Sequence, residues 1–67
     1  MRYLVLEIQA GDTISVLVND FDELSRAENK YHTILAYAAI SEIPIHSALL
    51  MTEEGIVNQQ YTYKHSK

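Results

Sequence analysis

Apolar and polar residues alternate through four segments of the chain, each about the length of a β-strand. Because successive side chains of a strand point to opposite faces, this period of two predicts four strands. A turn at Ala10–Asp12, in which Gly11 is free to take a positive φ, joins the first two strands into an antiparallel hairpin. A second turn, with Gly55 at the positive-φ position, joins the last two. The predicted strands are Arg2–Gln9, Thr13–Val18, Ile43–Met51 and Ile56–Tyr63.

Between the two hairpins the apolar spacing changes to three and four residues, which predicts one amphipathic helix. Asp22 is the preferred N-cap, because its carboxylate can accept hydrogen bonds from the free amides of the first turn. Ser25 and Glu28 form an alternative capping box that would start the helix three residues later. The helix is expected to end at Ser41–Glu42, and Pro44 prevents it from restarting. The predicted buried stripe consists of Leu24, Ala27, Tyr31, Ile34, Leu35 and Ala38.

This order of elements, β-β-α-β-β, predicts one small α+β domain over residues 1–67. The simplest arrangement is a four-stranded, mainly antiparallel sheet with one helix packed on one face. A single helix covers only one face, so a monomer would leave apolar side chains of the second face in water. We therefore expect a homo-oligomer, most simply a dimer that buries the second face. The side chains predicted to lie there are Tyr3, Val5, Leu17, Ala48 and Leu50.

Composition narrows the class of protein. The chain has no cysteine, which excludes disulfides, thiolate zinc sites and cysteine nucleophiles. Its 48% hydrophobic content with only two glycines and one proline favours a globular chain. The apolar run within Met1–Glu7 is too short for a signal peptide, and no run approaches the roughly 20 apolar residues of a membrane span. We expect a cytoplasmic protein without membrane contact.

The charge balance argues against nucleic-acid binding. Nine acidic and five basic residues give a formal charge of −4, whereas phosphate recognition needs clustered lysine and arginine. Tyrosines and lysines interleave over residues 61–67 in a pattern that can stack on single strands. A polar edge strand with solubilising lysines is the preferred interpretation. Residues 64–67 are expected to form a frayed tail, in which His65 has no assigned role.

Five side chains are candidates for chemistry. Glu28 and His32 are one helical turn apart, so the carboxylate can raise the pKa of the imidazole and orient it as a general base. Tyr31 and Ser47 can supply a proton or a nucleophile. His46, together with His32 and Glu28, can ligate zinc or another divalent metal. The preferred interpretation is an exposed pair on the helix beside a core tyrosine, with His46 hydrogen-bonded at an interface or loop.

Part of the pattern resembles a known family. The residues that carry the resemblance are Tyr3-Leu4-Val5, Glu54-Gly55 and Ala27-Glu28-x-Lys30-Tyr31-His32-x-Ile34-Leu35-x-x-Ala38-Ala39-x-Ser41-x-x-Pro44-x-His46-Ser47-Ala48. With these residues the chain resembles a family of small uncharacterised proteins from Gram-positive bacteria and their prophages. It departs from that family at Tyr37, where an alanine is expected. The resemblance implies a bacterial or phage cytoplasmic origin, and it implies no activity or substrate.

The leading functional hypothesis is a small, non-catalytic, oligomeric interaction or scaffold module, for which the resemblance suggests a phage origin. No known catalytic motif, and no motif for a cofactor or a metal, is present in the sequence. The alternative hypothesis is a small oligomeric enzyme, or a ligand- or metal-binding protein, with a site between subunits. That site would form around Glu28, His32 and His46, with Tyr31 close by.

Overall fold

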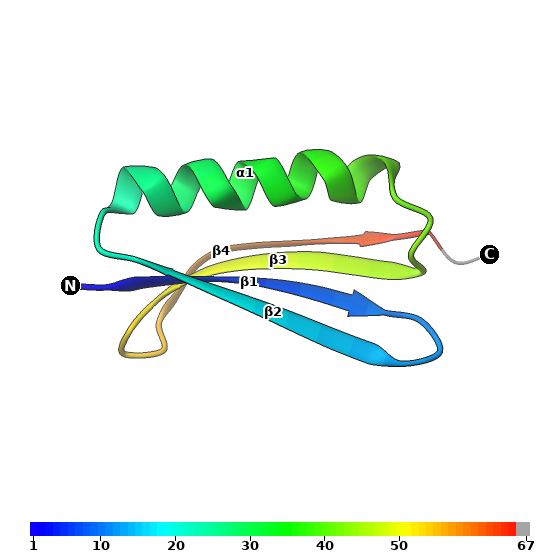
Figure 1. Ribbon diagram of the computed structural model, residues 1–67, viewed down its shortest axis with the longest axis horizontal. Helices are drawn as coiled ribbons and strands as arrows, with labels where there is room; N and C mark the ends of the chain where they lie inside the picture. Colours follow the sequence, from blue (N-terminus) through cyan, green and yellow to red (C-terminus); the bar gives the residue numbers. More distant parts are fainter. Residues whose placement is uncertain (66–67) are drawn as a thin grey trace.

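A computed structural model describes residues 1–65 and shows a four-stranded antiparallel sheet with one helix lying across it (Figure 1). The strands lie in the order β2-β1-β3-β4, so the two hairpins join side by side through β1 and β3. The predicted α+β class and β-β-α-β-β order are confirmed. The elements are β1 (Tyr3–Ala10), β2 (Ile14–Phe21), α1 (Leu24–Ile40), β3 (Ile45–Thr52) and β4 (Val57–Lys64).

The central strand β1 determines the register of the sheet. It pairs along its whole length with β2, from Tyr3 opposite Phe21 to Ala10 opposite Ile14. This pairing keeps β2 extended through Phe21, so the predicted end of the second strand at Val18 was too early. Polar residues are tolerated in this last part of β2 because it is an edge strand.

The two glycine turns differ. Gly55 has φ of +89°, as predicted for the turn between β3 and β4. Gly11, although free to do the same, does not: in residues 1–65 only Gly55 has a positive φ. The Gly11 amide instead donates to the Thr13 carbonyl at 2.9 Å, which closes the first turn.

Helix α1 begins at Leu24, and two residues separate it from the end of β2. Glu23, with extended backbone, occupies the N-cap position and its side chain makes no capping hydrogen bond. The predicted Asp22 cap was therefore wrong by one residue, because β2 continues to Phe21 and leaves a connection of only two residues. At the other end Ser41 is the C-cap, and its amide donates to the Ala38 carbonyl at 3.3 Å.

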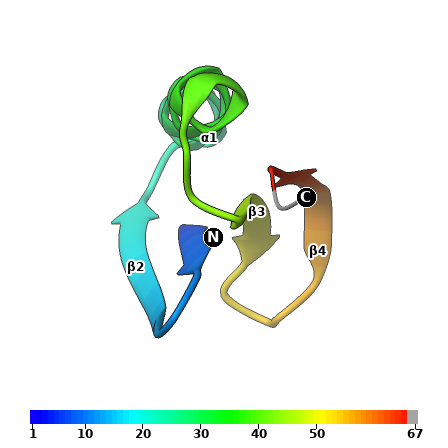
Figure 2. The same ribbon diagram turned by 90° about the vertical axis from the view of Figure 1, so that its right-hand side faces the viewer.

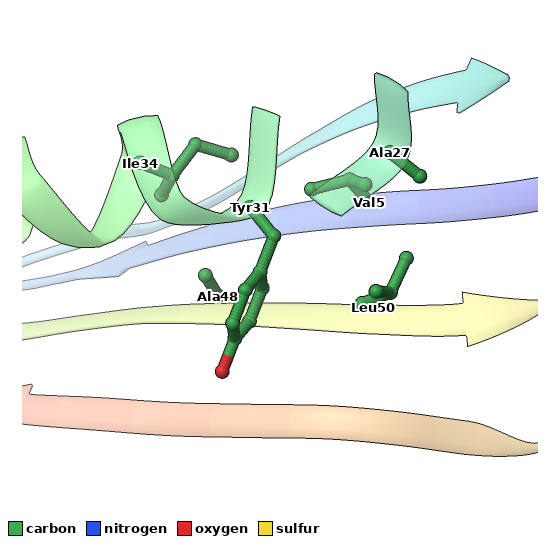
Figure 3. Packing of buried hydrophobic residues seen from close by; sticks show 6 residues of the cluster. All are labelled: Val5, Ala27, Tyr31, Ile34, Ala48 and Leu50. Atoms are coloured by element: carbon green, nitrogen blue, oxygen red, sulfur yellow. The ribbon is translucent and has the colours of Figure 1, made fainter. Parts of the chain in front are cut away.

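The core lies between α1 and the two central strands, and its main cluster contains six buried residues (Figure 3). The predicted helical stripe supplies Ala27, Tyr31 and Ile34 to this cluster. Small side chains such as Ala27 and Ala48 let the helix backbone approach the sheet closely. The sheet supplies Val5, Ala48 and Leu50, each 0% exposed.

This core corrects the prediction of which sheet face is uncovered. Val5, Ala48 and Leu50 were expected on the uncovered face, and they lie under the helix instead. Tyr3 also packs against the core, while Leu17 on edge strand β2 is 50% exposed. A helix is about 10 Å wide and strands are about 4.8 Å apart, so one helix covers roughly two strands. The face away from the helix has no covering element in the described part of the chain (Figure 2).

The C-terminal end of the described chain is tied down. Strand β4 continues to Lys64. The His65 amide donates to the Pro44 carbonyl at 2.7 Å, and its Nε2 lies 2.7 Å from the Ala38 carbonyl. The predicted fraying of Lys64 and His65 was therefore wrong, and residues 66–67 lie outside the described residues. Within residues 1–65, α1 is neither long nor apolar enough to cross a membrane.

Candidate functional site

The three candidates on the helix do not form a site. Tyr31 is a core residue, and burial raises the pKa of its hydroxyl, which disfavours a role in proton transfer near neutral pH. His32 is exposed and packs edge-to-face on the Tyr31 ring, with 5.4 Å between ring centroids. Glu28 accepts a hydrogen bond from Gln59 at 3.4 Å, and within residues 1–65 no ion pair joins it to His32.

His46 lies elsewhere, in a buried polar chain beneath the C-terminal end of the helix. Its Nε2 is 2.6 Å from Glu7 Oε2, and its Nδ1 is 3.0 Å from Ser41 Oγ. The side chains of His46 and Glu7 are 4% and 16% exposed. His32 and His46 therefore belong to different surroundings, and nowhere in residues 1–65 do three possible metal ligands come together.

In the Glu7–His46–Ser41 network, the donor of the hydrogen bond to Glu7 is defined. A carboxylate can only accept, so His46 Nε2–H donates to Glu7. The second ring nitrogen, Nδ1, makes its hydrogen bond with the Ser41 hydroxyl. Ser41 Oγ in turn accepts from the Ile43 amide at 3.2 Å. Gln9 Nε2 donates to the same Glu7 oxygen at 3.0 Å, so each member of the network has a partner.

Two opposing effects act on the Glu7 carboxyl. Burial alone would raise its pKa. Hydrogen bonds from Gln9 and His46, with positive charge at His46 and Lys30, outweigh burial and bring the Glu7 pKa below its ordinary value. Glu7 is therefore ionised near neutral pH, and it holds His46 in place.

A serine, a histidine and a carboxylate in one chain are the parts of a nucleophile–base–orienter arrangement. Here, however, the imidazole is 3% exposed, and no cavity opens beside it in residues 1–65. A general base must reach the group from which it takes a proton, and this imidazole has no such access. The Glu7–His46–Ser41 chain instead ties the helix C-terminus to β3 and β1.

Sequence reasoning singled out His46 and missed its partners. Glu7 and Ser41 are separated from it by 39 and 5 residues. The signal for Glu7 is the strand register: Gln9 lies opposite His46, which makes Glu7 its diagonal neighbour on the same face. The β1–β3 pairing joins two hairpins that are distant in sequence, so this register is not visible in a local pattern.

The second feature is the sheet face opposite the helix, which we call the open face. Ile14, Val16 and Val18 on edge strand β2 are 72%, 49% and 59% exposed. The register places aliphatic side chains of β1 next to them and those of β3 beyond β1. These side chains are half-buried by their neighbours, except for Ile45, which is 38% exposed. The open-face positions are Ile14, Val16, Val18 and Asp20 on β2; Leu4, Leu6, Ile8 and Ala10 on β1; Ile45, Ser47, Leu49 and Met51 on β3; and Val57, Gln60, Thr62 and Lys64 on β4.

Charge is sparse on the open face. Asp20 and Lys64 occupy diagonally opposite corners, and Asp20 forms an ion pair with Arg2. The other acidic side chains lie on the helix, in turns or on the helix-facing side, so the formal charge of −4 is concentrated away from the open face. A continuous apolar surface with uncharged neighbours is typical of a protein contact.

Comparisons of the chain with protein-family models, with curated proteins and with solved structures give no match. The resemblance to small proteins of Gram-positive bacteria and their prophages stays a prediction. The open face is thus the candidate functional site on geometric grounds.

Proposed function

We propose that the protein is a small, non-catalytic interaction module that works through the open face of its sheet, and that it associates with a second copy of itself. One observation carries the proposal: nine aliphatic side chains of β2, β1 and β3 share a face that no element covers in residues 1–65. They are Ile14, Val16, Val18, Leu4, Leu6, Ile8, Ile45, Leu49 and Met51.

Size supports the same proposal. A domain of about 60 residues buries only about 60% of the surface that its unfolded chain exposes, and its stability is correspondingly marginal. The chain contains 67 residues and no disulfide. Covering the open face with another copy would enlarge the apolar core on the side that the helix leaves uncovered. Association of this kind is a common route by which small domains gain stability.

Two neighbouring residues of β2 provide a matched test. Val16 and Leu17 are 49% and 50% exposed, on the same edge strand, but Val16 lies on the open face and Leu17 on the helix side. We expect Val16→Lys to convert the oligomer to a monomer in sedimentation-velocity experiments at micromolar concentration. Because its charge lies off the interface, Leu17→Lys should sediment like the wild type.

Circular dichroism of both variants checks that the fold is intact. A wild-type chain that sediments as a monomer up to hundreds of micromolar would refute self-association. An equal effect of both lysines would place the contact elsewhere than on the open face.

A further inference from the structure

From the proposed self-association we infer how the two copies are arranged: their open faces stack, with the two-fold axis running along β1. Strand β1 of one copy then lies over β1 of the other, and both β4 strands extend beyond the contact. The inference follows from the distribution of polarity across the sheet. The arrangement determines which residues lie opposite the same residue of the second copy and which remain in water.

The open face divides into an apolar part and a polar part. Strands β2, β1 and β3 carry apolar side chains at nearly every open-face position, with Ser47 and Asp20 as the exceptions. Strand β4 instead presents Gln60, Thr62 and Lys64, and only Val57 is apolar. The apolar part is therefore centred on β1, because β2 and β3 are its two neighbours.

Stacked faces of identical chains are related by a two-fold axis that lies in the plane between them. An axis parallel to β1 places β2 over the partner's β3 and β3 over the partner's β2. Apolar strands then meet apolar strands, and β4 has nothing opposite it. This is the aligned packing of two sheets, with strand directions about 30° apart because of sheet twist.

An axis perpendicular to the strands gives a less favourable match. It places β4 over the partner's β4, which buries Gln60 and Thr62 against polar groups. It also places the Lys64 corner over the Val57 corner, whereas the axis along β1 leaves Lys64 in water. Asp20 faces an apolar side chain in both arrangements, Ile14 here and Met51 with the axis along β1, so it does not distinguish them. Burying a charge against apolar atoms is costly, so the axis parallel to β1 is favoured.

Charge also favours a second copy as the occupant of the open face. Lys64 lies on the strand that extends beyond the contact, and Asp20 is already paired with Arg2. The remaining acidic groups of this chain lie away from the open face. Two copies can therefore approach through this face without like-charge repulsion, although each carries a formal charge of −4.

The absence of cysteine from the chain makes the arrangement testable with single thiols. An axis along β1 brings every open-face residue of β1 opposite itself, so Ile8→Cys should cross-link to a covalent dimer with a short bismaleimide. Leu4→Cys, at the other end of β1, should do the same and covers the case in which Ile8→Cys folds poorly. Gln60→Cys should give no covalent dimer, because β4 lies outside the contact.

The perpendicular axis predicts the opposite result. The two central rows across the sheet would then face each other, so that Gln60 lies over Thr62 of the second copy and the two copies of Gln60 come within reach of a short bismaleimide. The arrangement would be overturned if Gln60→Cys cross-linked, or if the chain sedimented as a dimer while neither β1 variant cross-linked. Either result would leave the proposed self-association standing. A monomeric wild type in sedimentation would remove both. Cross-linking is compared with the same variants in denaturant, where only chance encounters occur.

Discussion

The helix covers one face of the sheet and leaves the other uncovered, and the hydrophobicity of the two faces does not predict which one it covers. The face under the helix contains Val5, Ala48 and Leu50, but also the polar side chains of Glu7 and His46. The open face is the more uniformly aliphatic of the two on β1, with Leu4, Leu6 and Ile8 in succession. The helix thus covers the more mixed face, and the larger aliphatic surface is left for another contact.

Packing geometry accounts for this choice. The helix face that meets the sheet includes Ala27 and Ala38, and the sheet offers Ala48 opposite. Small side chains on both sides allow the backbones to approach, and Tyr31 fills the remaining space over Ala48 (Figure 3). Leu and Ile residues of the open face would hold a helix further away, but they suit the spacing of about 10 Å between two stacked sheets.

The largest effect that separates the two faces should come from truncating neighbouring leucines of β3. Leu50 is fully buried under the helix, and Leu49 is half-buried on the open face. We expect Leu50→Ala to lower the free energy of unfolding by about 2–5 kcal/mol, because it leaves a cavity in the core. Leu49→Ala should cost the isolated chain about 1 kcal/mol, since the deleted atoms are already partly in water.

Urea denaturation at concentrations where the chain is monomeric measures both values. The comparison matters more than either number, because the two residues are adjacent and chemically identical. If Leu49→Ala cost the monomer as much as Leu50→Ala, the open face would be packed as tightly as the covered one. The distinction between the faces would then be lost.

A smaller effect is expected from the polar part of the covered face. Replacing His46 by alanine leaves the Glu7 carboxylate and the Ser41 hydroxyl without their imidazole partner. We expect His46→Ala to lower the free energy of unfolding by about 1–3 kcal/mol, the cost of an unsatisfied buried group. Thermal denaturation followed by circular dichroism is a suitable measurement.

The matched control is His32, an exposed histidine of helix α1. His32→Ala should stay within about 0.5 kcal/mol of the wild type, as surface substitutions usually do. Similar losses for the two histidines would mean that the buried polar chain contributes nothing particular to stability.

Local patterns were sufficient to predict the elements of this fold and insufficient to orient them. Alternation assigns Leu6 and Val5 to opposite faces of β1, but a period of two says nothing about which face a helix will cover. Small side chains on both sides of the contact, Ala27 on the helix and Ala48 on β3, decide that. The Glu7–His46 contact depends on the non-local β1–β3 register, which no single segment encodes. His46 was identified because of its residue type, whereas Glu7 could be recognised only from its place opposite β3.

The smallest predicted effect is a pH dependence of the free energy of unfolding, which arises from Glu7 on the sheet face under the helix. Gln9, His46 and Lys30 together lower the pKa of Glu7 against the opposing effect of burial. Because the folded-state pKa is below the unfolded one, the carboxylate contributes stability at pH values above the unfolded pKa of about 4.3. This contribution is lost as the pH falls through the folded-state pKa, when the folded chain also takes up the proton. The effect is absent if the carboxyl is replaced by an amide.

We therefore expect the difference in free energy of unfolding between wild type and Glu7→Gln to shrink as the pH is lowered from about 6 to about 3. Urea denaturation along this series measures it. Glu54→Gln, at an exposed turn position, is the control and should follow the wild type throughout. Both variants retain the open face and could still self-associate. Measuring them in the Val16→Lys background keeps the chain monomeric, so that the free energy of unfolding reports on Glu7 alone. A difference that stays constant with pH would show that Glu7 stabilises the fold through its shape and hydrogen bonds alone, with no contribution from its charge.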